Sequence, residues 1–66
     1  MKAPQPEELR AEIARHELLI YQVAALAGRH PSTVSRWLHA KAPMPPAEAA
    51  RIGEAIRSLS EGRGVR

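Results

Sequence analysis

An apolar segment that ends at a glycine, with a proline three positions further on, constrains the fold of this chain more than any other feature. The segment Leu18–Ala27 is too short for the roughly 20 apolar residues of a membrane span. Gly28 follows it, and glycine is the usual residue where a helix ends in the left-handed conformation. Pro31 suits the first position of a helix, because its missing N–H would have no intrahelical partner there. We therefore expect a short buried helix, a tight turn and a second short helix that ends at about Leu38 or His39.

Another helix is predicted before this pair. It begins near Pro6, with two glutamates in its first turn that face the positive end of the helix dipole. Leu9 and Ile13 recur at helical spacing and mark its apolar side. We expect this helix to end near His16 or Glu17.

The last helix is predicted after a proline-rich loop. Residues 40–46 contain three prolines, which remove hydrogen-bond donors and push the preceding residues toward extended geometry. Pro46 opens the next helix, with Glu48 as a solvated partner of the helix dipole, and the helix runs to about Ser60. Its apolar face consists of Ala49, Ile52, Ile56 and Leu59. Residues 61–66 hold two glycines without periodicity, which predicts a loose, flexible tail.

Composition narrows the class of protein. The chain has 66 residues, is rich in alanine and lacks phenylalanine. This predicts a single all-α domain that spans residues 1–66, with a core at about 6–60. The absence of cysteine excludes disulfides and thiolate zinc sites, and the three histidines fit no metal-ligand pattern. There is also no nucleophile and base pair, phosphate loop or pair of catalytic carboxylates. We expect no enzymatic activity, cofactor, metal or small-molecule substrate, and the lack of an apolar signal segment at the start predicts a cytoplasmic protein.

Two short helices joined by a glycine-containing turn, the second polar on its outer side, match the physical description of a helix-turn-helix. Ala24 is expected where the two helices cross closely. Val34 and Trp37 are expected to form the inward face of the second helix. Its outward side chains are Ser32, Thr33, Ser35 and Arg36. Short hydroxyl groups that approach closely, together with one long guanidinium fork, suit the edges of bases in the major groove of DNA.

Most of the chain, from Leu9 to Ile56, resembles the helix-turn-helix domain of the lambda-repressor and Cro family of phage and bacterial regulators. Four diagnostic positions of that family are matched by Ala24, Gly28, Val34 and Trp37. The run Ser32-Thr33-Val34-Ser35-Arg36 is similar to its usual recognition-helix sequence. The resemblance implies a compact all-α fold of four to five helices with a central helix-turn-helix. It also implies base contacts from Ser32, Thr33 and Arg36.

The chain departs from that family at several positions. Leu19 and Ile20 stand where the family commonly has a hydroxyl cap and a phosphate-binding glutamine, so Tyr21 or Gln22 is expected to replace that contact. Arg29 occupies a turn position that is usually apolar, from which it could reach a phosphate. The full set of residues expected to contact phosphates is Tyr21, Gln22, Arg29, His30, Pro31, His39 and Lys41.

Each of these residues also has a simpler explanation. Arg36 could be a solvated surface arginine, and the flanking basic residues could be solvated charges. The hydroxyl residues Ser32, Thr33 and Ser35 could serve only to satisfy N–H groups at a helix start. Trp37 is expected in the core rather than stacked on a base, because of its spacing from Val34.

The hypothesis that follows is a sequence-specific regulator of the Cro or repressor type, phage-borne or phage-derived. It would bind a short double-stranded DNA operator as a homodimer, with candidate dimer surface on the fourth helix, Met44 and Val65. Two other classes stay open. One is an antitoxin-like or adaptor protein-interaction module, whose sign would be an exposed apolar patch. The other is an excisionase-like recombination factor.

Overall fold

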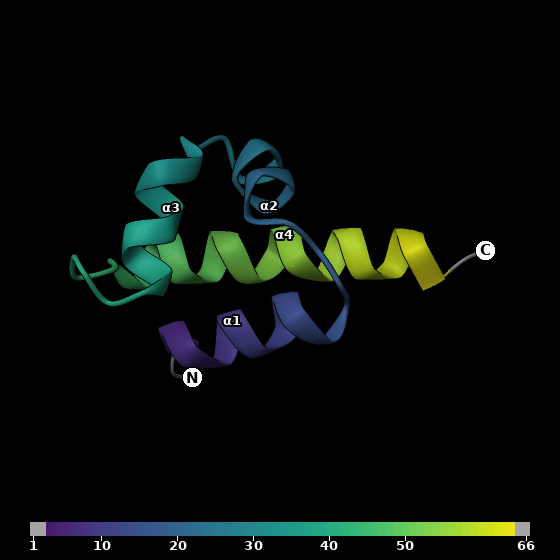
Figure 1. Cartoon of the computed structure of the whole chain (residues 1–66), viewed down its shortest axis with the longest axis horizontal. Coiled ribbons are helices and arrows are strands. Elements are labelled where there is room, and N and C mark those ends of the chain that lie inside the picture. The colour runs from purple at the N-terminus through teal and green to yellow at the C-terminus, as the bar shows by residue number, and fades with distance from the viewer. Residues whose placement is uncertain (1–2, 65–66) are drawn as a thin grey trace.

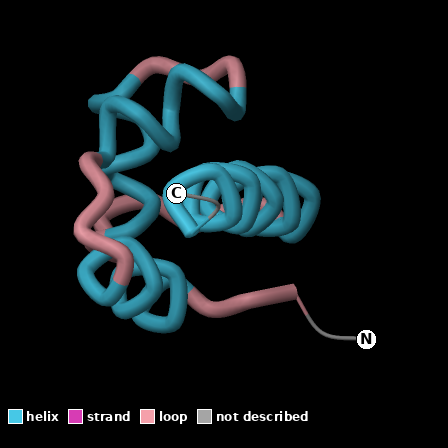
Figure 2. The backbone as a smooth tube through the Cα atoms, turned by 90° about the vertical axis from the view of Figure 1, so that its right-hand side faces the viewer, coloured by secondary structure: helices cyan, strands magenta, loops and turns pink. Residues whose placement is uncertain are grey.

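The computed structural model describes residues 3–64, and these form four α-helices and no strand. The helices are α1 (Pro6–Arg15), α2 (Ile20–Ala27), α3 (Pro31–Leu38) and α4 (Pro46–Gly64). The predicted all-α class is confirmed. In Figure 1, α4 runs along the length of the molecule, with α1 on one side of it and α2 and α3 on the other. Figure 2 looks nearly along α4 and shows the other helices grouped to one side of it.

The core forms where all four helices meet. Its buried side chains are Leu9, Ile13, Leu18, Val23, Ala24, Ala27, Val34, Leu38, Ala49, Ile52, Ala55 and Ile56. α4 packs against both α1 and α2, and α3 packs against α1 and α2. The side chain of Ala24 is completely buried, and its small size suits α2 to close contact with its neighbours. The chain can therefore fill its interior without phenylalanine, because small residues let the helices approach one another.

Two predicted faces need correction. On α3 the fully buried pair is Val34 and Leu38, whereas Trp37 is half-buried and packs against the edge of the core. A spacing of four residues keeps Val34 and Leu38 close to one direction on the helix, while the large indole lies on the flank. The helix predicted within Leu18–Ala27 begins only at Ile20 and is not buried throughout. Three large hydrophobic side chains in and beside this helix are exposed: Leu19, Tyr21 and Leu26.

The end of α4 also differs from the prediction. The helix continues to Gly64 rather than stopping at about Ser60, so residues 61–64 are helical where a loose tail was expected. Gly62 did not end it, because glycine in an exposed helix costs only about 1 kcal/mol relative to alanine. Residues 65 and 66, including Val65 of the candidate dimer surface, lie outside the described part of the chain.

Three helices end in the same way, each with a residue of positive φ just beyond its last turn. These residues are Glu17 (56°), Gly28 (73°) and Ala40 (58°). In each case the next N–H bonds back to a carbonyl five residues earlier, as Leu18 N does to Ile13 O at 2.9 Å and Lys41 N to Arg36 O at 2.8 Å. This is the Schellman arrangement. The sequence predicted it only at Gly28, because glutamate and alanine carry a steric penalty in the left-handed region.

Helix starts are capped by side chains. Glu8 Oε1 accepts the N–H of Gln5 at 2.7 Å, and Gln22 Oε1 accepts the N–H of Leu19 at 2.9 Å. His30 Nδ1 accepts the N–H of Ser32 at 3.1 Å at the start of α3. Each of these bonds satisfies a backbone donor that has no partner within its own helix.

Exchanging glycine and alanine at two helix ends should change stability in opposite directions. An added Cβ at Gly28 would meet no atom within 4 Å, so Gly28→Ala should lower the free energy of unfolding through backbone strain alone, by roughly 1 kcal/mol. Ala40→Gly relieves the same strain and should raise it by up to about 1 kcal/mol. Urea unfolding of both variants checks this, and shifts of the same sign would contradict it.

Ala24 and Ala25 form a matched pair for testing the packing of α2. Ala24 is buried and Ala25 is exposed. Ala24→Leu should overpack the contact between α2 and its neighbours and destabilise the domain by roughly 1 to 3 kcal/mol, whereas Ala25→Leu should leave the melting temperature close to that of the wild type. Equal melting temperatures for the two variants would show that α2 does not depend on a small residue at position 24.

Candidate nucleic-acid interface

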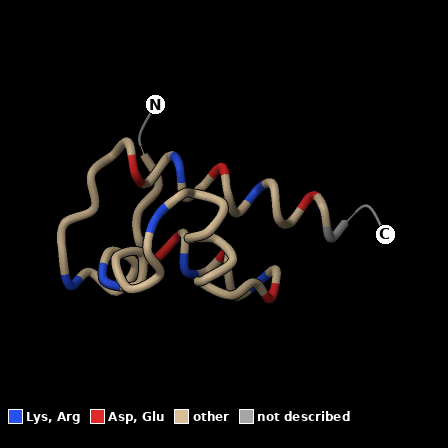
Figure 3. The backbone as a smooth tube through the Cα atoms, turned by 90° about the horizontal axis from the view of Figure 1, so that it is seen from above, with Lys and Arg blue, Asp and Glu red and all other residues tan. Residues whose placement is uncertain are grey.

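Charge is distributed very unevenly along this chain. All seven carboxylates lie at or before Glu17 or at and after Glu48. The 30 residues between them contain Arg29, Arg36 and Lys41 and no acid. Since the formal net charge of the whole chain is +3, these three residues account for it and the rest of the sequence sums to zero. In Figure 3 the acidic positions accordingly follow α1 and α4, while the loop after α3 carries one basic position and no acidic one.

The outer side of α3 brings several of the predicted contact residues together. Val34 and Leu38 point into the core, so the opposite side of the helix faces solvent. There, a shallow hollow of about 450 Å³ is lined by Ser32, Ser35, Arg36, His39 and Lys41. Lys41 reaches this group because the chain reverses at Ala40, whose φ is positive.

Arg36 is the exposed cation at the centre of this face. Its side chain forms no hydrogen bond or ion pair with any residue between 3 and 62. Other arginines are engaged within the chain, as Arg15 is by Glu12 and Arg57 by Glu54. A guanidinium that no internal carboxylate occupies keeps its donors for an external acceptor.

The two histidines that flank α3 are used in different ways. His30 Nδ1 accepts the N–H of Ser32 and lies 2.7 Å from Ser32 Oγ, so its ring is committed to capping the helix. His39 Nδ1 lies 2.9 Å from the carbonyl oxygen of Ser35. Because a carbonyl can only accept, His39 Nδ1 carries the proton in this contact, so Nε2 of the neutral ring is an acceptor and cannot donate to a phosphate oxygen. His39 is exposed and can accept a hydrogen bond from an external donor.

The remaining predicted contact residues lie elsewhere. Thr33 is half-buried and does not line the hollow. Pro31 is exposed at the first position of α3. Tyr21 is exposed in the first turn of α2, and the side-chain oxygen of its neighbour Gln22 is occupied by the N–H of Leu19.

Arg29, a predicted phosphate contact, forms an ion pair inside the chain. Its Nε and Nη2 atoms donate to the two carboxylate oxygens of Glu48, both at 2.8 Å, and its Nη1 donates to the carbonyl of Gly28 at 3.1 Å. The side chain of Glu48 is only 19% exposed, which corrects its interpretation as a solvated helix-start residue. Sequence reasoning missed the pair because its members stand 19 positions apart and no periodicity connects them.

A second arginine strengthens the same connection. Arg51 Nη1 donates to the carbonyl of Ala27 at 3.3 Å, so the turn between α2 and α3 is tied to the first turns of α4 at two points. The hydrogen bonds from Arg29 hold the pKa of Glu48 below its ordinary value of 4.5, against the opposing effect of burial, and the charges of Arg29 and Arg51 add to this lowering. The same bonds and the carboxylate charge raise the pKa of Arg29.

The lowered pKa of Glu48 predicts a specific loss of stability in acid. The carboxylate stabilises the folded state fully above its unfolded pKa, near 4.5, and this contribution is lost as the pH falls through the lower folded value. Urea midpoints of the wild type and Glu48→Gln should therefore differ most at pH 6 and converge below pH 4. A difference that stays constant across this range would mean that the ionised carboxylate contributes nothing.

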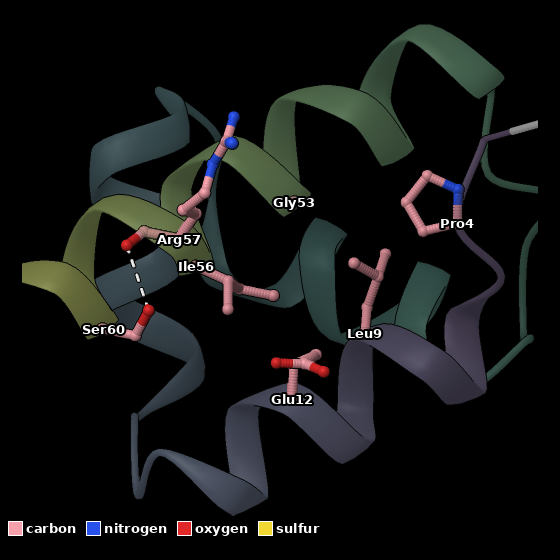
Figure 4. Close-up of a pocket in the computed structure, with 7 residues that line it drawn as sticks. All are labelled: Pro4, Leu9, Glu12, Gly53, Ile56, Arg57 and Ser60. Carbon is pink, nitrogen blue, oxygen red and sulfur yellow. Dashed lines mark hydrogen bonds between the residues drawn. The ribbon is translucent and has the colours of Figure 1, made fainter. Parts of the chain in front are cut away.

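A second hollow lies between α1 and α4 (Figure 4). It measures about 290 Å³ and is mostly apolar, with Leu9 and Ile56 on its walls. Its charged lining residues, Glu12 and Arg57, are already paired with neighbours on their own helices. It therefore offers less for an anionic partner than the face of α3 does.

Searches for other sites and for related proteins give few further indications. No helix within residues 3–64 is long and apolar enough to cross a membrane. Over the same residues, no three histidine or acidic side chains gather as metal ligands would. Neither family models nor curated proteins nor solved structures give a match to this chain.

Proposed function

We propose that this protein binds double-stranded DNA sequence-specifically, as a regulator of the Cro or repressor type that reads the major groove with α3. The observation that carries the proposal is the outer face of α3. There Arg36, which pairs with no side chain among the described residues, lies beside the hydroxyl groups of Ser32 and Ser35, in a segment without a single carboxylate. A phosphate backbone would meet no like charge along that segment.

The dimensions and chemistry of α3 fit this role. An α-helix with its side chains is about 10 to 12 Å wide, and the major groove is about 12 Å wide. Serine side chains are short enough to let the backbone of the helix approach the base edges. A guanidinium can then donate two parallel hydrogen bonds to the O6 and N7 atoms of a guanine. Lys41, at the end of the same face, is placed to meet a phosphate beside the bases that Arg36 reads.

The α2–turn–α3 unit serves as the helix-turn-helix in this proposal, and the whole domain as a four-helix version of the lambda-repressor fold. Support comes from buried Ala24, the left-handed Gly28 and the turn that joins the two helices. A regulator of this kind acts on DNA in the cytoplasm. The proposed function involves no catalysis.

We further propose that the protein acts on its operator as a homodimer. One short helix reads too few base pairs for specificity, whereas two copies read half-sites about 34 Å apart, one turn of DNA. The molecule measures 36 × 27 × 19 Å, so two copies placed side by side match that spacing. An isologous pair of this kind would bind a palindromic site.

Selection from random duplex DNA tests the proposal, and Arg36→Ala tests its central residue. We expect enrichment of a short palindromic site. On that site, Arg36→Ala should weaken binding by about 1 to 3 kcal/mol, with little change on random DNA. Arg57→Ala is the matched control, because it removes an exposed arginine from α4 and should affect both DNAs equally and weakly.

Two results would count against the proposal, the first against the role of Arg36 and the second against sequence-specific binding itself. An equal loss on both DNAs with Arg36→Ala would reduce Arg36 to a phosphate contact. If no site is enriched and the remaining binding falls steeply with salt, only a nonspecific electrostatic attraction exists. The protein-interaction module then becomes the better candidate, and one observation favours it. Leu19, which directly precedes α2, and Leu26, near the end of α2, are each more than half exposed.

A further inference from the structure

The structure gives Arg29 a different role from the one that the sequence predicted. Its position beside α3 predicted a phosphate contact, yet both oxygens of Glu48 hold its guanidinium at 2.8 Å. This fork-to-fork geometry fixes orientation as well as distance. Arg29 directly follows the left-handed Gly28 and precedes the residue that caps α3. A movement of α3 that carries this turn with it would therefore separate the pair.

We infer that the Arg29–Glu48 pair is a latch that sets the orientation of α3 relative to α4, and that Arg29 is a positioning residue for DNA binding rather than a phosphate contact. This inference rests on the proposed function for its DNA-binding arm only. α3 makes its helix contacts with α1 and α2, and α4 makes its own with the same two helices. The latch connects α4 to the turn that enters α3, with Arg51 supporting it through the carbonyl of Ala27.

Glu48→Gln separates the two roles of Arg29 by the sign of its effect. The variant removes a negative charge and releases the guanidinium, so a phosphate-binding Arg29 should bind DNA more tightly in it. A latch should instead lose its grip on α3, and binding to the selected site should weaken, on the order of tenfold. Arg29→Gln should weaken binding to a similar extent. The variant that combines Glu48→Gln with Arg29→Gln should bind the site no more weakly than whichever single variant binds it less tightly.

Two further readouts exclude a general electrostatic explanation. Arg29→Lys keeps the charge but not the planar fork, so it should behave like Arg29→Gln if the residue is a latch and like the wild type if it holds a phosphate. The slope of the logarithm of the binding constant against the logarithm of the salt concentration should stay unchanged in all latch variants. Loss of one phosphate contact would instead lower the size of this slope by about 0.9. Glu54→Gln with Arg57→Gln is the matched control, because that pair lies exposed on α4.

Amide hydrogen exchange without DNA tests the latch independently of the proposed function. Glu48→Gln and Arg29→Gln should both accelerate exchange in α3 and its preceding turn, relative to α1, while the control pair leaves that ratio unchanged. Unchanged exchange in α3, or tighter DNA binding by Glu48→Gln, would overturn the inference. If the wild type binds no specific DNA but exchange in α3 accelerates as expected, the proposed function fails and the latch stands.

Discussion

The burial of one face of α4 is the constraint on which the other helices depend. Ala49, Ile52, Ala55 and Ile56 are buried along this face, and α1 and α2 both pack against the same helix. Alanine at two of these four positions lets the neighbouring helices come close. At about 25 cal/mol per Å² of apolar surface, such contacts supply most of the stabilisation available to a small domain. The chain has no disulfide that could substitute for them.

The way α3 is anchored to this core determines which of its side chains face solvent. α3 is anchored by two fully buried residues, Val34 and Leu38, with Trp37 packed beside them. Its remaining residues can therefore be polar, so eight residues both pack against the core and present the polar face on which the proposed DNA contact rests. The tight ends of the helix, capped by His30 and by the turn at Ala40, hold it in place where the buried area is small.

Local signals predicted much of this fold from the sequence, and long-range contacts were beyond them. The starts of three helices at Pro6, Pro31 and Pro46 were predicted correctly because proline at a first helical position is a local signal. The ends of α1 and α3 were predicted to within one or two residues, but the left-handed residues beyond them, Glu17 and Ala40, were not, because no glycine marks them. Leu38 and Trp37 exchanged roles because a periodic pattern gives an approximate direction and not the depth of each side chain. The pairing of Arg29 with Glu48 depends on how α4 returns to the turn, which no local pattern contains.

The uneven placement of charge also affects how the molecule moves before it touches anything. Because the residues between Glu17 and Glu48 hold the whole formal net charge of +3 and Glu48 already pairs with Arg29, the unbalanced positive charge of this segment lies with Arg36 and Lys41 on the outer side of α3. In the field of a polyanion, a molecule with positive charge gathered on one side turns so that this side leads. That attraction would favour the proposed DNA-contacting face at first encounter. A chain with the same net charge spread evenly would have to find that orientation by chance.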